Sequence, residues 1–267
     1  MKYEEIIRIL TEALQIVTEF AQSGKKFATI AAKNFIVYGD IHGEPEIARQ
    51  ALADAKAGNQ VICLGDLAWR NVSGNNIPLG MFQTTMLLIE AMVKYNALIV
   101  RGNCDCREMM QGLYIAEVYP EITTKWAEQK QLSEVICSLM ELLPIGANTA
   151  GSALVHGCAG KNMPSADAFT WSVFNPEISE DRIFEKFGPP SFEICWQSVI
   201  DFVFKGTSRK NLFIGHDKRG IVGEQGYQIY ERGNYRIVRM MSSSQSGAVK
   251  RPIKCIVSGD NLEFMPL

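Results

Sequence analysis

The stretch FIVYGDIHG, residues 35–43, joins a short apolar run to a polar segment bounded by glycines. The run FIVY has the pattern of a buried β-strand, and the polar residues begin where that strand would end. Asp40 and His42 are two positions apart, so at an extended strand end their side chains would point the same way. The stretch therefore predicts a strand that brings a carboxylate and an imidazole to one ion.

The same arrangement recurs four times along the chain. Each time an apolar run ends abruptly in glycine and polar residues: VICL–GDLAWR (61–70), ALIV–RGNCD (97–105), ALV–HG (153–157) and LFI–GHDKRG (212–220). Helices are predicted between several of these runs, at 44–57, 80–95 and 121–142, and this alternation is typical of an α/β domain. Because ligands bind at the carboxyl ends of strands in open α/β sheets, the five motifs predict one shared site at one sheet edge.

The histidines indicate what that site binds. The chain has three, and each adjoins a glycine at the end of an apolar run. Imidazole is the commonest side-chain ligand of transition metals, and a carboxylate can bridge two cations in a phosphoryl-transfer site. The predicted metal ligands are Asp40, His42, Asp66, Asn103, His156 and His216. This mixture of ligands favours two ions of manganese, the expected metal, or of iron, zinc or nickel.

The composition is that of a globular protein. The chain has 267 residues, 47% of them hydrophobic, and a formal net charge of −2, which provides no long-range attraction for nucleic acid or for an acidic membrane. Seven scattered cysteines form no CxxC pair and no disulfide framework. We therefore expect reduced thiols and a cytoplasmic protein, with no membrane partner.

The two ends of the chain differ from its middle. Residues 1–30 form a predicted amphipathic helical extension, which either packs on the main domain of residues 33–267 or mediates a homodimer. The segment 158–198, rich in aromatic residues and proline, is interpreted as an irregular insertion near the site. Alternating residues after 226 predict an antiparallel meander.

The motifs GDIHG, GDLAWR, RGNCD, HG and GH, in that order, resemble those of the calcineurin-like metallophosphoesterase superfamily. The resemblance implies an α/β fold, a four-layer α/β/β/α sandwich with a dinuclear centre. Asp40 and His42 would hold the first ion and Asn103, His156 and His216 the second, with Asp66 bridging them. A metal-bridging hydroxide would be the nucleophile.

Two departures from the family pattern affect the choice of substrate. Phosphomonoesterases of the family carry histidine after the asparagine, where this chain has Cys104, and an aspartate of the phosphoprotein phosphatases is replaced by Trp69. The G-N-C-D motif is similar to that of small phosphodiesterases, whereas His216 followed by Asp217 resembles phosphoprotein phosphatases and dinucleoside tetraphosphatases. The subfamily therefore stays open.

The sequence predicts a hydrolase of phosphodiesters or of small phosphorylated molecules such as nucleotides. The predicted catalytic residues are Asp66, Asn103, Cys104 and Arg70, and Arg70 and Arg101 are predicted to bind the substrate phosphate, since guanidinium suits bidentate phosphate recognition. The alternatives are a phosphoprotein phosphatase and a non-catalytic scaffold of the same fold that binds partner proteins.

Overall fold

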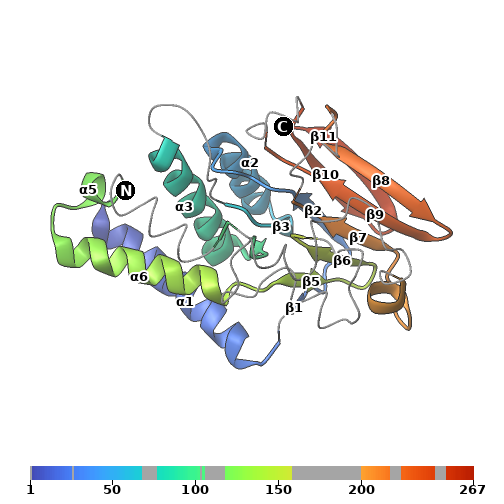
Figure 1. Ribbon diagram of the computed structural model, residues 1–267, viewed down its shortest axis with the longest axis horizontal. Coiled ribbons are helices and arrows are strands. Elements are labelled where there is room, and N and C mark those ends of the chain that lie inside the picture. The colour runs from blue at the N-terminus through green and yellow to red at the C-terminus, as the bar shows by residue number, and fades with distance from the viewer. Residues whose placement is uncertain are drawn as a thin grey trace, which may run out of the picture.

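Two β-sheets lie face to face in the computed structural model, with helices packed on the outside (Figure 1). The structure describes residues 2–25, 27–67, 77–102, 104–105, 118–157, 200–216, 224–243 and 251–267. The predicted α/β architecture of two sheets and helices, with a helix at the N-terminus, is confirmed.

The first sheet has five strands in the order β11-β10-β2-β3-β4. Its strands are β2 (Asn34–Tyr38), β3 (Val61–Cys63), β4 (Leu98–Ile99), β10 (Ile253–Ser258) and β11 (Asn261–Pro266). The strands β2, β3 and β4 are parallel, and β10 runs antiparallel to both β2 and β11.

The second sheet has six strands in the order β1-β5-β6-β7-β9-β8. Its strands are β1 (Phe27–Thr29), β5 (Gly146–Asn148), β6 (Ser152–Val155), β7 (Asn211–Ile214), β8 (Tyr227–Arg232) and β9 (Tyr235–Met240). The strands β6, β7 and β9 are parallel, while β8 runs antiparallel to β9.

Alternation along each strand sorts the apolar side chains into layers. On β2, Phe35 and Val37 enter the core between the sheets, while Ile36 and Tyr38 face the helices. On β7, Phe213 enters the same central core and its two neighbours face the outer side of the six-stranded sheet. Successive strand residues point to opposite faces, so a continuous apolar run fills two cores at once.

Helices cover the outer face of the five-stranded sheet. The helices α2 (Pro45–Lys56) and α3 (Ile77–Tyr95) lie against it, and α1 (Tyr3–Gln22) packs on α3 and on α6 (Trp126–Leu142), with the short α5 (Tyr119–Ile122) leading into α6. On the outer side of the six-stranded sheet, the described residues form one π-helix, η1 (Ile200–Phe204). Its residues Val203 and Phe204 pack on β6 and β7. In the part of the chain that the structure describes, no helix is long and apolar enough to cross a membrane.

The N-terminal helix is packed on the rest of the chain. Its buried residues are Ile6, Ile9, Leu10, Ala13 and Val17, and it contacts α6 and α3. The strand β1 that follows pairs in parallel with β5, at the edge of the six-stranded sheet. Packing on the domain, one of the two predicted roles, is thus what the structure describes, while the homodimer and the domain boundaries stay predictions.

Two predictions about the sheets need correction. The five polar motifs were expected at the edge of one sheet, but β2, β3 and β4 belong to one sheet and β6 and β7 to the other. The C-terminal strands form two hairpins rather than one meander, because β8–β9 joins the six-stranded sheet and β10–β11 the five-stranded sheet. The predicted insertion 158–198 lies outside the described residues.

Candidate metal centre

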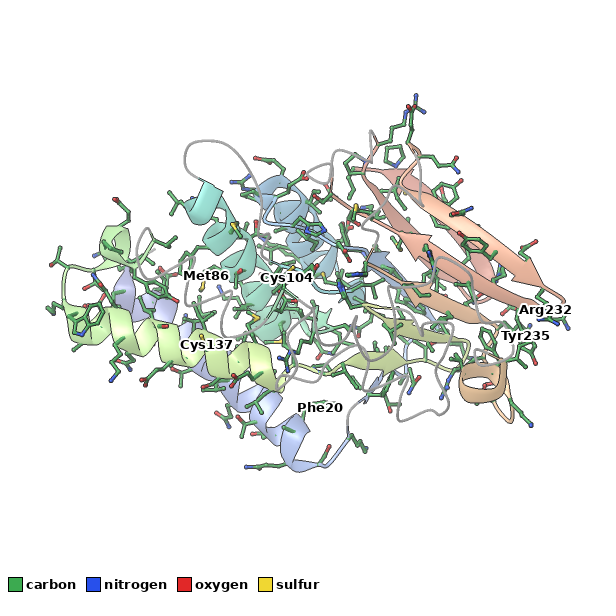
Figure 2. The ribbon with its side chains drawn as sticks, in the orientation of Figure 1. Phe20, Met86, Cys104, Cys137, Arg232 and Tyr235 are labelled. Atoms are coloured by element: carbon green, nitrogen blue, oxygen red, sulfur yellow. The ribbon has the colours of Figure 1, made fainter. Side chains whose placement is uncertain are left out.

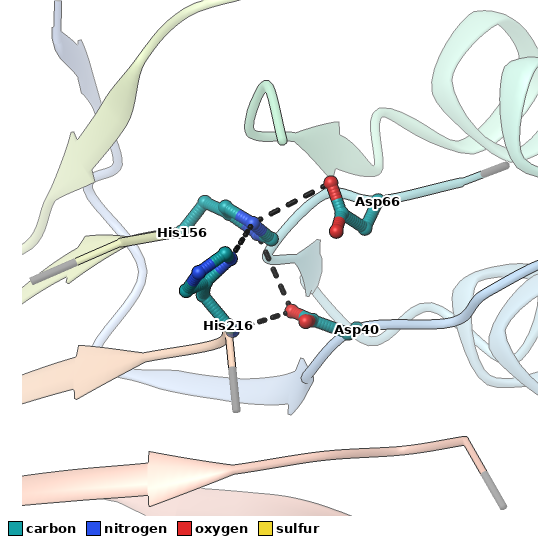
Figure 3. Close-up of side chains that lie close together, drawn as sticks. All are labelled: Asp40, Asp66, His156 and His216. Atoms are coloured by element: carbon teal, nitrogen blue, oxygen red, sulfur yellow. Dashed lines mark hydrogen bonds and ion pairs between the residues drawn. The ribbon is translucent and has the colours of Figure 1, made fainter. Parts of the chain in front are cut away.

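Four side chains converge where the two sheets meet at their carboxyl ends (Figure 3). Asp40 and Asp66 follow β2 and β3 of one sheet, and His156 and His216 follow β6 and β7 of the other. Each of the four offers a ligand atom, and these atoms all lie within 4.8 Å of one another. Two carboxylates and two imidazoles are ligands that suit manganese, iron or zinc, so this set fits a transition metal.

The hydrogen bonds of His156 orient its ring toward the cluster. Its Nδ1 lies 2.8 Å from the backbone oxygen of Leu64 and so donates to that carbonyl. The other ring nitrogen, Nε2, lies 3.1 Å from Nδ1 of His216 and 3.4 Å from Oδ1 of Asp66. A carbonyl that fixes one imidazole N–H leaves the second nitrogen to bind a metal, as in many metal sites.

The charges in the cluster also favour a bound cation. Burial opposes charge on His156, yet Asp66 and Asp40 outweigh it and raise the pKa of this histidine to about 10. Burial and the neighbouring His156 lower the pKa of His216 to about 4. Burial alone would raise the pKa of Asp40, but His156 and His42 lower it below its usual range. The buried carboxylates therefore favour a positive charge close to them, and a bound metal ion can supply that charge.

His42 reaches the site by a different geometry from the predicted one. Its Nε2 lies 3.4 Å from Oδ2 of Asp40, so the two side chains meet as expected. The backbone between them is not an extended strand, however, because β2 ends at Tyr38 and His42 has a left-handed φ of 48°. Asp66 and His216 share this conformation, with φ of 49° and 45°. Such strained backbone tends to cluster at functional sites, where the surrounding structure holds it in place.

Two glycines allow the ligand loops to approach each other. A β-carbon on Gly215 would overlap Oδ1 of Asp40, and one on Gly102 would overlap the backbone nitrogen and Oδ1 of Asp66. Oδ1 of Asp40 also accepts a hydrogen bond from the backbone nitrogen of His216 at 2.8 Å. Only glycine, which has no β-carbon, fits where two segments approach this closely, and this explains the glycines beside these ligands.

Other predicted site residues have different positions. Asn103, Arg70 and Trp69 lie outside the described residues. Cys104 is buried in the middle of the molecule, 8% exposed, and its backbone nitrogen donates to Oδ1 of Asp66 at 2.8 Å (Figure 2). Arg101 is also buried, and its Nη1 donates to the backbone oxygen of Glu141 at the C-terminal end of α6. Its predicted role in phosphate binding stays a prediction.

Two further residues, which were not predicted as site residues, support the site. Asp105 is fully buried. Its carboxylate accepts hydrogen bonds from the backbone nitrogens of Asp66 and Leu67, after β3, and of Gly102, after β4. Burial and Asp66 raise its pKa to about 6. Ser242 accepts from the nitrogen of Gly39 at 2.8 Å and donates to the oxygen of Ile253. The acidic last position of the G-N-C-D motif could have indicated Asp105, whereas Ser242 bonds to Gly39 from 203 positions away in the sequence and has no comparable local signal.

The comparisons with known proteins identify the family and the fold of this chain. The family model for calcineurin-like phosphoesterases matches residues 33–231. Among solved structures, the chain is similar to a protein serine/threonine phosphatase from Saccharomyces cerevisiae with similarity to human phosphatase PP5, with a TM-score of 0.69 at 14% identity over 100% of this chain and 90% of that one. A search of curated protein sequences gives no match.

Two other solved structures are more distant. A putative diadenosine tetraphosphatase has a TM-score of 0.49 at 16% identity, covering 90% of this chain and 97% of that chain. A metallophosphoesterase from Sphaerobacter thermophilus has a TM-score of 0.43 at 14% identity, covering 88% of each chain. Of these three likenesses, the fold comparison rests on the yeast phosphatase.

The fold and the cluster together define a metal-dependent phosphoester hydrolase. The family model covers well over half of the chain, so the chain belongs to the calcineurin-like phosphoesterase family. The predicted superfamily and the predicted class of enzyme are thereby confirmed.

Proposed function

We propose that this chain hydrolyses phosphodiesters or small phosphorylated molecules such as nucleotides, at a centre of two metal ions. The proposed ligands are the six that the motifs predict: Asp40, His42, Asp66, Asn103, His156 and His216. The observation that supports this most strongly is the convergence of four of them, from four strands in two sheets, within 4.8 Å. A fifth, His42, contacts Asp40.

The residues of the chain would have two roles at such a centre, as metal ligands and as groups that position those ligands. Bound cations would supply Lewis acidity toward a phosphoryl oxygen and make water nucleophilic at neutral pH. Asp66 and His156, with Oδ1 of the one 3.4 Å from Nε2 of the other, would hold a metal ion together. Leu64 holds the ring of His156 through its carbonyl, and the nitrogen of His216 holds Oδ1 of Asp40. These backbone contacts fix ligand atoms before any substrate arrives.

The proposed substrate class depends on Cys104. All three histidines of the chain are proposed as metal ligands, so no imidazole remains to protonate a leaving group. A thiol has an unperturbed pKa of ~8.5 and is a weak substitute for an imidazolium at neutral pH. The proposed enzyme therefore acts best on esters whose leaving group departs without a protein acid. Arg70 and Arg101 are the proposed phosphate-binding residues.

A phosphoprotein phosphatase is the second candidate. The motif around His216, with Asp217 after it, resembles that branch, and the loss of histidine at position 104 argues against it. We also propose a cytoplasmic location, because seven scattered cysteines with no CxxC pair favour reduced thiols.

Paired substrates separate these possibilities. The purified protein, with added Mn²⁺, would be given a bis-aryl phosphate, the corresponding aryl monophosphate and a phosphorylated peptide. Preference for the bis-aryl ester supports the proposal, and preference for the peptide supports the phosphoprotein phosphatase. Bound metal without turnover of any of the three would contradict the proposal in favour of a non-catalytic scaffold.

A further inference from the structure

The carboxylate of Asp105 joins the two loops that follow β3 and β4. Its Oδ2 accepts hydrogen bonds from the backbone nitrogens of Asp66 at 2.8 Å and Gly102 at 2.7 Å. Its Oδ1 accepts from the backbone nitrogen of Leu67 at 2.9 Å. The residue has no exposed surface. One buried side chain thus bonds three backbone groups in two different loops.

The contact between the loops is reciprocal. While Asp66 donates its backbone N–H to Asp105, its own Oδ1 accepts the backbone N–H of Cys104. Each loop therefore supplies a carboxylate to the other. These bonds hold Gly102 and Cys104, the residues on either side of Asn103 in the sequence, against Asp66.

The backbone of Asp66 needs such support. Its φ of 49° lies in the left-handed region, which is unfavourable for a residue other than glycine. The bond from its N–H to Asp105 is charge-assisted, and such bonds are about twice as strong as neutral ones. Asp105 therefore stabilises the strained conformation that directs the carboxylate of Asp66 into the cluster.

A stable fold alone does not account for a carboxylate at position 105. Burying a third negative charge beside Asp66 and Asp40 adds repulsion and desolvation cost, and neutral acceptors also satisfy backbone N–H groups. Near bound cations the same charge becomes favourable, because it strengthens the attraction that holds the metals. The position of Asp105 therefore has a cost in the metal-free protein and a benefit in the metal-bound protein.

We propose that Asp105 is a positioning residue that raises the metal affinity of the site by fixing Asp66 and Gly102. This inference rests on the proposed metal centre. Asp105 does not reach the metal in this proposal. It acts through the backbone of Asp66, and residues of this kind typically change metal affinity by about 10–100-fold when they are replaced.

The test uses Asp105→Asn and Asp105→Ala, with Asp54→Asn as the matched control. An asparagine at 105 presents an NH₂ group to at least one N–H that the carboxylate now accepts, while alanine removes all three bonds. Asp54 is another largely buried carboxylate, which accepts from Tyr38 and Lys254 at 2.6 Å, and none of these three residues is a proposed metal ligand. The measurements are the affinity for Mn²⁺ alone, by calorimetry, and the melting temperature with and without Mn²⁺.

We expect the affinity for Mn²⁺ to fall about 10–100-fold in Asp105→Asn and further in Asp105→Ala. The Mn²⁺-induced rise in melting temperature should shrink in the same order, whereas Asp54→Asn should lower the melting temperature and keep the full rise. Equal affinity in wild type and Asp105→Asn would overturn the proposal, as would an asparagine variant that fails to fold even with Mn²⁺, since Asp105 would then serve the fold. No Mn²⁺ binding by the wild type would instead overturn the metal centre itself.

Discussion

His156 directs its Nε2 at Nδ1 of His216 across 3.1 Å, with the two rings edge to face. The strands β6 and β7 that deliver them are parallel neighbours, with Val155 opposite Ile214. One of these two nitrogens must carry a proton for a hydrogen bond to form between them, whereas a metal ligand must offer its lone pair. A proton at this contact and a bound metal ion would therefore compete.

The metal-free protein should lose stability as the pH rises from about 6.5 to about 8.5. The pKa of His156 is raised from 6.5 to about 10 in the folded state, so the folded chain holds a proton that the unfolded chain releases. The stabilisation is complete below pH 6.5 and disappears as the pH passes through the folded value. Thermal unfolding in a chelating buffer measures it.

His156→Gln is the control for this effect and should flatten the pH dependence in that window. The window ends below the range in which buried thiols contribute, since burial raises the pKa of Cys63 from 9.0 to about 12. A wild type whose stability stays constant or rises between pH 6.5 and 8.5 would contradict the assigned protonation of His156.

Gly215→Ala should abolish metal binding, because its new β-carbon would overlap Oδ1 of Asp40 and displace this ligand atom. Gly151→Ala is the matched control, since a β-carbon there meets no atom within 4 Å. Metal content after dialysis measures the effect in both variants. A Gly215→Ala protein with full metal content would show that this close approach is not required.

Cys104→His should restore a proton donor beside the site. We expect hydrolysis of an alkyl monophosphate, whose leaving group needs protonation, to rise by roughly tenfold or more, with little change for an activated aryl ester. Cys104→Ala separates the gain of imidazole from the loss of the thiol. Unchanged or slower alkyl ester hydrolysis in Cys104→His would count against the missing-acid argument.

Leu10→Ala should destabilise the whole domain by about 2–5 kcal/mol, because Leu10 is fully buried where α1 packs on its neighbours. Ile16→Ala on the same helix, at a side chain that is 43% exposed, should change stability by about 0.5 kcal/mol or less. Chemical denaturation measures both. Equal, small effects would mean that α1 does not contribute to the cooperative core.

Local features of the sequence predicted much of this structure. The run FIVY and the residues after it lie within nine positions, so the strand, its end and the first ligands can be recognised together. The same holds for the loop from Gly102 to Asp105 and for His156 after β6. Strand length, alternation and glycine position are local properties of the sequence, so these elements could be predicted from it.

Long-range pairing could not be predicted in the same way. The hydrogen bond from the backbone nitrogen of Gly39 to Oγ of Ser242 and the β-bridge between Asp40 and Met241 join residues about 200 positions apart. The division of the strands into two sheets depends on such pairings, because hydrophobic alternation does not say which strand lies beside which. The left-handed backbone of His42 was not predicted either, because the side-chain pattern alone assigned this residue to an extended strand end.

A metal titration coupled to turnover tests the central claim most directly. Metal-free wild type and Asp66→Asn would be titrated with Mn²⁺ while bound metal and hydrolysis of a bis-aryl phosphate are measured together. Turnover should rise with occupancy and saturate at about two ions per chain, and both turnover and metal binding should be lost in Asp66→Asn. Full turnover in Asp66→Asn, or in wild type that binds no metal, would contradict it.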